Sequence, residues 1–363
     1  DLPNEYAGIR HTFIPDIKPG QKYGYLVSHK EELILISDPY AKSIDKALHY
    51  HPPYSPAKSF DMPKCIVIED NFDWQNTDHP RIPREEMVLF ETHVKGLTQL
   101  HPEVEDKLKG RYLGLASPKM LAFYEQQNIN TLQLLPVAAC MHEPHLLEME
   151  KVNYWGYNPY LFMVPDPRYA EKDAVTELKT TIRELHKNGI EVILDVVYNH
   201  TAEGGEGPTI FNLKALDSRF YIKHGNHFAN YTGCGNTVDL TYQPALNLVM
   251  DTLRYWVSEF KVDGFRFDLA ATLGRQGDDY NPEAAFFKAV AQDPILRETK
   301  LIAEPWDISR YSLGEFQYPW REWNDYYRDA VRQFWLGDIA RGFGEGVSAL
   351  ASSISGSSNI FYF

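Results

Sequence analysis

The sequence is poor in cysteine, in basic residues and in long apolar runs. Its three cysteines, Cys65, Cys140 and Cys234, are scattered and odd in number, which argues against a disulfide scaffold or a zinc site and fits a reducing, cytoplasmic compartment. Basic residues number 36 against 50 acidic ones, and the net charge of −14 argues against nucleic acid or an anionic membrane as a partner. No stretch approaches the roughly 20 apolar residues of a membrane helix, and none has the pattern of a signal peptide.

What the chain does have is an ordinary globular composition with many aromatic residues. Hydrophobic residues make up 44% and charged residues 24%, which excludes a disordered or collagen-like chain. A length of 363 residues favours two or three domains. Aromatic residues reach 13%, and their flat rings either stack on sugar faces or fill a large core, so composition alone fits both uses.

Residues 1–84 are expected to form a small β-sandwich as a first domain. Short apolar runs at Tyr23–Val27, Leu33–Ile36 and Cys65–Ile68 are broken by proline, glycine and aspartate, and no helical period of any length is present.

From residue 85 to 363 the pattern changes to strands alternating with helices. Alternation of this kind predicts parallel strands with helical crossovers, and six units in series favour a (β/α)8 TIM barrel, truncated after about six strands. The helices include Ser117–Asn128, which opens with Ser-Pro, Asp173–Asn188, which stops at Gly189, and Ala245–Phe260, which has a one-sided apolar stripe. The expected strands are Met87–Glu91, Thr131–Pro136, Val192–Val197, Gly264–Asp268, Leu301–Glu304 and Glu322–Asp325.

Two carboxylates end neighbouring strands of this predicted barrel. Side chains alternate along a strand, so Arg266 and Asp268 share one face, and Glu304 ends the next strand. Neighbouring strands lie about 4.8 Å apart, which would bring the two carboxylates to about 5 to 5.5 Å, the separation in a retaining glycosidase. Carboxylates that cap helices or pair with lysine would give the same pattern, and spacing alone leaves both interpretations open.

The two carboxylates have neighbours that favour different protonation states. Arg266 beside Asp268 favours the ionised, nucleophilic form of that carboxylate. Glu304 is followed by Pro305 and Trp306, and an apolar wall there would favour the protonated acid.

Three further groups of polar and aromatic residues suit binding roles as well as structural ones. Asp195 and His200, at the end of a third strand, suit hydrogen bonds to sugar hydroxyls, although a histidine there is also a common structural group. The aromatic run Tyr154–Tyr157 suits either a sugar-stacking platform or loop packing. In His142–His145 a proline breaks any helix that would align metal ligands, so we expect no metal site.

Together these residues resemble the α-amylase superfamily of glycoside hydrolases, and within it the bacterial glycogen debranching enzymes of isoamylase type. Three of the four signature blocks stand in order, as Asp195–His200, Gly264–Asp268 and Ile302–Trp306. The leading β region is similar to the family's immunoglobulin-like, carbohydrate-binding sandwich. Further supporting runs are Glu91–Thr98, Asn153–Pro159, Pro165–Ala170, Thr232–Thr237 and Glu322–Asp325.

The resemblance implies a role for each site residue. Asp268 would be the nucleophile and Glu304 the general acid/base. Arg266 would hold Asp268, Asp195 and His200 would bind hydroxyls of the sugar at the cleavage point, and Tyr157 would stack under that ring.

The activity that it implies is retaining hydrolysis of α-1,6 branch linkages in glycogen or its limit dextrin, within glycogen catabolism in the bacterial cytoplasm. No cofactor and no metal are implied. The alternatives are a starch-type isoamylase, an α-1,4-acting amylase and a non-catalytic glucan-binding homologue.

One departure from the family pattern concerns the end of the sequence. The fourth block, a His-Asp pair, is expected after Phe363, together with two more strands and a C-terminal sandwich. A segment before Asp1 is also expected. We therefore expect this sequence to be part of a longer protein, and the piece alone to be inactive and poorly soluble because of its open sheet edges.

Overall fold

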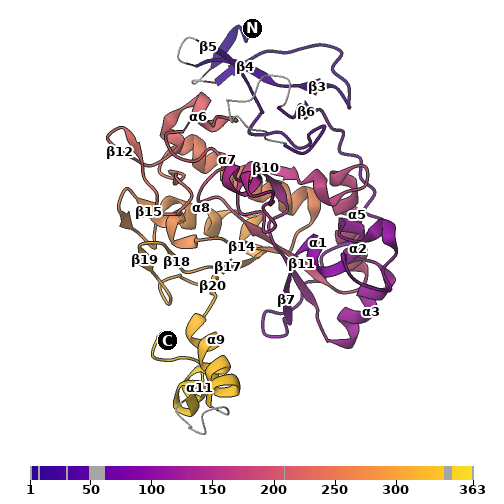
Figure 1. Cartoon of the computed structure of the whole chain (residues 1–363), viewed down its shortest axis with the longest axis vertical. Coiled ribbons are helices and arrows are strands. Elements are labelled where there is room, and N and C mark those ends of the chain that lie inside the picture. The colour runs from indigo at the N-terminus through magenta and orange to yellow at the C-terminus, as the bar shows by residue number, and fades with distance from the viewer. Residues whose placement is uncertain are drawn as a thin grey trace.

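The centre of the molecule is a parallel sheet of six strands with helices packed around it (Figure 1). The structure is a computed structural model that describes residues 2–6, 9–29, 32–48, 62–207, 209–338 and 346–361. In chain order the strands of this sheet are β7 (Leu89–Thr92), β8 (Thr131–Leu134), β11 (Glu191–Val196), β14 (Gly264–Phe267), β17 (Lys300–Ala303) and β20 (Arg321–Glu322).

The strand order identifies the kind of sheet. Each strand pairs in parallel with the strand before it, so the order β7 to β20 never reverses. Because parallel crossovers are right-handed, an unreversed order puts the connecting helices on one face, as in a barrel and unlike a doubly wound sheet. The sheet therefore fits a truncated (β/α)8 barrel, as the sequence predicted.

The expected strands are all present, with one change at the sixth. There the strand is Arg321–Glu322, and Asn324 caps helix α9 (Asp325–Arg332) by accepting a hydrogen bond from the Tyr327 amide. Asp325 therefore begins a helix and does not end a strand, because the Asn324 side chain is a better helix cap than a strand residue.

The three expected helices are also present, as α3 (Pro118–Gln126), α5 (Ala174–Lys187) and α7 (Gln243–Phe260). Phe265 of β14, Trp256 of α7 and Leu178 of α5 belong to one core and are at most 1% exposed. No helix within the described ranges is long and apolar enough to cross a membrane. The shorter helices are α1 (Val94–Thr98), α2 (Tyr112–Leu115), α4 (Pro144–Glu148), α6 (Leu213–Leu216), α8 (Ala285–Gln292) and α11 (Gly346–Ile354).

The described residues up to Ile66 include small antiparallel pairs of strands. β1 (Asn4–Tyr6) pairs with β2 (Ile9–His11), β4 (Tyr25–His29) with β5 (Glu32–Ile36), and β3 (Lys22–Tyr23) with β6 (Cys65–Ile66). The region is thus β in character, while a complete immunoglobulin-like sandwich over 1–84 stays a prediction.

A strap, residues 77–84, runs across the amino ends of the barrel strands. The His79 ring lies 2.8 Å from Asp263, which directly precedes β14, and the Ile82 amide donates to Glu191 at the start of β11. Arg84 donates to the carbonyl of Thr299, directly before β17. The predicted domain boundary after residue 84 lies at the end of this strap.

Candidate active site

The predicted site residues lie at the carboxyl ends of three adjacent strands. Asp195 is in β11 and pairs in register with Arg266 of β14. Asp268 follows β14 directly, and Glu304 follows β17 directly. Since the carboxyl ends of neighbouring parallel strands meet at one edge, this placement gathers the charged side chains at the edge where barrel enzymes carry out their chemistry.

Arg266 is the centre of this cluster. Its Nη1 lies 2.9 Å from Asp195 Oδ1 and 3.3 Å from Asp268 Oδ1, and its Nη2 lies 3.1 Å from Glu304 Oε2. The arginine side chain is only 3% exposed, so its charge is compensated by these carboxylates and not by water. The sequence predicted Arg266 as a partner of Asp268 alone; in the structure it joins all three carboxyl groups.

Each of the two central carboxyls has a further partner from a neighbouring segment. The Asn199 side-chain amide donates to Asp268 Oδ2 at 2.8 Å and to the Asp268 carbonyl at 2.7 Å. The Leu269 backbone amide donates to Glu304 Oε2 at 2.8 Å. The Leu269 backbone has a φ of 41°, a left-handed conformation that is unusual for leucine. The amide that contacts Glu304 therefore belongs to a residue in a strained conformation.

Burial dominates the protonation of the cluster. It raises the pKa of Asp268 and of Glu304 above their ordinary values, although the Arg266 charge opposes the rise in both. It also raises the pKa of Asp195 to about 7, again against the Arg266 charge. The expected effect of Arg266 on the pKa of Asp268 is therefore present, but Arg266 also lowers the pKa of Asp195 and Glu304, and burial outweighs it in all three.

Trp306 donates a hydrogen bond to Glu304, whereas the sequence predicted an apolar wall there. A hydrogen bond from its side chain favours the ionised form of Glu304, which opposes the effect of burial. The indole N–H is the only donor that a tryptophan side chain has. Trp306 therefore orients the carboxyl, and its effect on the pKa of Glu304 is opposite in sign to that of the apolar wall that the sequence predicted.

Tyr157 and His200 form the second layer of the cluster. The Tyr157 hydroxyl donates to Asp195 Oδ2 at 2.6 Å. His200 is 1% exposed; its Nδ1 contacts Asn199 Oδ1 and its Nε2 lies 3.0 Å from the Tyr157 carbonyl oxygen. Burial lowers the pKa of His200 to about 4. In this arrangement the histidine ties Asn199 to the Tyr157 loop.

Sequence reasoning did not single out three of these contacts. Asn199 stood inside the Asp195–His200 run and was given no role, and the Leu269 amide carries no signal in its residue type. Trp323, which follows β20, lies with its ring 4.2 Å from the Arg266 guanidinium. Only the neighbouring positions of β14, β17 and β20 bring that ring to the arginine, so spacing along the chain could not reveal it.

A possible metal-binding group lies at the opposite end of the sheet. Among the described residues, His79, His186 and Asp263 have ligand atoms within 4.8 Å of one another. Asp263 directly precedes β14, whereas Asp268 follows it, and both histidines hydrogen-bond to the Asp263 carboxylate at 2.8 Å. This group holds the strap to the barrel and is not part of the carboxylate cluster.

The fold and the cluster together define the class of the chain: a parallel (β/α) sheet of six strands that fits a truncated barrel, with carboxylates at its carboxyl edge. Among solved structures it is similar to a pullulanase from Bacillus acidopullulyticus, with a TM-score of 0.74 and 26% identity over 94% of this chain and 43% of that one. A pullulanase from Anoxybacillus sp. LM18-11 in complex with maltotriose has the same fold, with a TM-score of 0.72 and 24% identity over 96% of this chain and 51% of that one.

Sequence comparison is more specific. The chain is 41% identical over 389 residues to a glycogen operon protein GlgX homolog of Mycobacterium bovis, covering 97% of this chain and 53% of that protein. It is also 41% identical over 372 residues to a glycogen debranching enzyme of Erwinia tasmaniensis, covering 94% of this chain and 56% of that protein. The predicted resemblance to bacterial glycogen debranching enzymes is thus confirmed, and the chain spans about half the length of these curated relatives. No protein-family model matches it.

Proposed function

We propose that this chain carries the catalytic carboxyls of a glycoside hydrolase that cleaves α-1,6 branch linkages of glycogen with retention of configuration. The observation that supports this most directly is the convergence of Asp195, Asp268 and Glu304 on Arg266 at the carboxyl edge of the barrel. The relative that is named a glycogen debranching enzyme supplies the substrate class.

In the proposed reaction Asp268 attacks the anomeric carbon of the branch glucose. Glu304 gives its proton to the departing oxygen, so the glycosidic C–O bond breaks as the bond to the Asp268 oxygen forms. Glu304, now ionised, then takes a proton from water, and the resulting hydroxide attacks the same carbon and releases Asp268. Each carboxyl thus returns to its starting state, with two inversions and net retention.

The other residues are assigned to binding and orientation. Arg266 and Asn199 hold the Asp268 carboxylate. Burial raises the pKa of Glu304, which favours the protonated acid that the first step needs. Tyr157, Asp195 and His200 are assigned to the glucose at the cleavage point. The substrate is a branched α-glucan such as limit dextrin, the reaction uses no cofactor, and the protein acts in the bacterial cytoplasm.

The test compares two substrates in the full-length protein. Release of reducing ends from glycogen limit dextrin, with little from linear amylose, is the expected result. NMR of the first product formed should detect the α-anomer before mutarotation. Cleavage only of linear amylose would show an α-1,4-acting amylase, a β-anomer would exclude retention, and binding without turnover would indicate a non-catalytic glucan-binding protein.

A further inference from the structure

A pocket of about 510 Å³ lies beside the carboxyl end of β7, and none of the residues that line it belongs to the carboxylate cluster. We call it the basic pocket. Its volume is within the range of roughly 300–1,000 Å³ that is usual for small-molecule sites. Its lining includes Lys95, Lys109, Arg111, Asn153, Tyr154 and Arg168.

The charge of the basic pocket is opposite in sign to that of the whole chain. Four of its lining side chains are Lys or Arg, and Asp106 is its one carboxylate, in a protein of net charge −14. Three of the four cations have a carboxylate partner: Lys109 pairs with Asp106 at 2.7 Å, Arg111 with Glu171 at 3.6 Å and Arg168 with Asp166 at 2.6 Å. In the part of the chain that the structure describes, no carboxylate lies within ion-pair distance of Lys95, so this lysine carries the uncompensated charge of the pocket. A positive pocket in an acidic protein concentrates anions locally.

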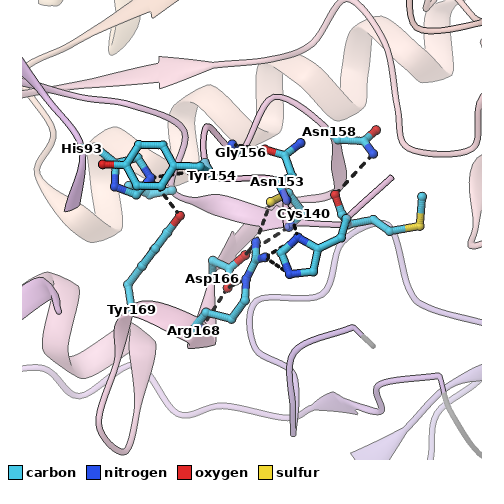
Figure 2. A network of polar contacts seen from close by, with 12 residues as sticks. His93, Cys140, Asn153, Tyr154, Gly156, Asn158, Asp166, Arg168 and Tyr169 are labelled. Carbon is cyan, nitrogen blue, oxygen red and sulfur yellow. Dashed lines mark hydrogen bonds and ion pairs between the residues drawn. The ribbon is translucent and has the colours of Figure 1, made fainter. Parts of the chain in front are cut away.

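Arg168 is held rigidly in the wall of the pocket. Figure 2 shows its guanidinium between the Asp166 carboxylate, 2.6 Å from Nη2, and the Cys140 sulfur, also 2.6 Å from Nη2. The same side chain contacts the His142 ring at 2.9 Å. A cation fixed by so many partners loses little conformational freedom when a ligand binds beside it.

One wall of the basic pocket is a flat aromatic ring. Tyr154 stacks on His93 with the ring centres 4.1 Å apart and the planes 14° apart (Figure 2). Tyr154 is nevertheless 43% exposed, which leaves its outer face available for contact. Asn153, its neighbour, also lines the pocket. An aromatic face next to an amide suits a sugar ring, whose apolar face stacks while its hydroxyls form hydrogen bonds.

The position of that wall is fixed in advance by His93 and Gly96. His93 Nδ1 accepts hydrogen bonds from the amides of Lys95 and Gly96, so its Nε2 carries the proton and donates to the Tyr154 carbonyl at 2.6 Å. A Cβ at Gly96 would lie 1.9 Å from the Tyr154 hydroxyl oxygen, so the ring would have to shift to admit any other residue here.

We propose that the basic pocket binds a hexose phosphate, with the phosphate near Lys95 and the sugar ring against Tyr154. The site is separate from the carboxylate cluster, and the proposal does not depend on hydrolysis of any glucan. The basic pocket is connected to the carboxylate cluster through one loop: Tyr154 and Tyr157 both belong to it, and Tyr157 donates a hydrogen bond to Asp195.

The test is isothermal titration calorimetry of the protein with glucose 1-phosphate, compared with glucose and with inorganic phosphate at equal ionic strength. The expected result is binding of glucose 1-phosphate at least about tenfold tighter than either part alone, since both the charge and the ring contribute. Absence of binding at millimolar concentrations would overturn the proposal. Equal binding of inorganic phosphate would also overturn it, because the sugar would then contribute nothing.

Two variants and one matched control locate the ligand. Lys95→Gln should weaken glucose 1-phosphate binding by about tenfold, because a charge-assisted contact is lost. Lys107→Gln is the control: Lys107 is exposed, pairs with Glu105 at 3.2 Å and does not line the pocket, so binding should be unchanged. Tyr154→Ala should abolish the advantage of glucose 1-phosphate over phosphate. Equal losses in the two lysine variants, or unchanged binding in Tyr154→Ala, would place the ligand elsewhere.

Discussion

Nη2 of Arg266 lies 3.1 Å from Oε2 of Glu304, a residue on the neighbouring strand. The same guanidinium contacts Asp268, so one positive charge acts on both central carboxyls. A difference in their protonation must therefore come from their other partners. The Asn199 amide lowers the pKa of Asp268, whereas the Asp268 charge raises the pKa of Glu304, against the Leu269 amide and Trp306, which lower it.

Removing either catalytic carboxyl should abolish turnover and spare binding. Asp268→Asn and Glu304→Gln keep the size of each side chain, and we expect turnover in the full-length protein to fall by several orders of magnitude, with glucan affinity nearly unchanged. Steady-state kinetics and equilibrium binding to limit dextrin measure the two effects. Near-normal turnover in either variant would refute its assigned role.

Azide distinguishes the two roles. With Glu304→Ala, azide should attack the covalent intermediate and give an α-glucosyl azide, because the nucleophile is intact. With Asp268→Ala, azide should take the place of the carboxylate and give the β-product. The opposite pair of products would exchange the assignments of Asp268 and Glu304. Glu298→Gln is a matched control, since the Glu298 side chain is 79% exposed and should not matter.

Asn199 should act as a positioning residue for Asp268. Asn199→Ala removes a 2.8 Å hydrogen bond to the carboxylate, and such bonds to charged groups contribute about 1.5–3 kcal/mol, so we expect kcat to fall by about 10- to 150-fold. KM should change little, because Asn199 is 1% exposed and is expected to make no contact with substrate. A large rise in KM with kcat unchanged would instead show a binding role.

Asp195 should make stability depend on pH in a specific direction. Burial raises its pKa from 3.8 to about 7, so the folded protein binds this proton more tightly than the unfolded chain does. The free energy of unfolding should therefore fall as pH rises between these values, and Asp195→Asn should remove this loss, which is at most about 4 kcal/mol.

The measurement is urea unfolding of wild type and Asp195→Asn at several pH values between about 4 and 7. The free energy of unfolding of Asp195→Asn, relative to that of wild type, should increase as pH rises. Asp251→Asn, which changes a side chain that is 45% exposed, should run parallel to wild type. A difference that is constant with pH would contradict the buried titration.

Gly96→Ala should disturb the Tyr154 loop. The added Cβ would lie 1.9 Å from the Tyr154 hydroxyl oxygen, and overpacking of this kind costs about 1–3 kcal/mol. Gly207→Ala is the matched control, because a Cβ there has no atom within 4 Å. Thermal unfolding should show a lower Tm for the first variant only. Equal Tm values would mean that the ring moves aside without cost.

Much of the barrel could be predicted because its signals are local. The stripe on α7 and the Ser-Pro start of α3 depend on residues within a few positions of one another, as does the alternation that puts Arg266 and Asp268 on one face. The sixth strand was predicted too long because the run Glu322–Asp325 contains a helix cap, Asn324, that competes with strand pairing.

The parts of the site that could not be predicted depend on distance in three dimensions. Whether Arg266 serves one carboxyl or three depends on how three strands align, and the reach of Trp323 depends on the curvature of the sheet. The raised pKa values follow from burial, which residue type alone does not reveal. The basic pocket combines Lys95 of α1, residues 106–111, the Asn153 loop and Arg168, and has no contiguous motif.

The strap at residues 77–84 limits how the molecule can be dissected. Deleting everything up to residue 84 would remove His79 from Asp263 and the Ile82 amide from Glu191, two carboxylates that are at most 7% exposed. Asp263 would keep His186 and Glu191 would keep Lys300, but each buried anion would lose a hydrogen bond, so a protein shortened at that point would be expected to be less stable for reasons unrelated to the lost β region. A protein that begins at Thr77 would keep both His79 and Ile82, so its behaviour would report on the loss of the β region alone.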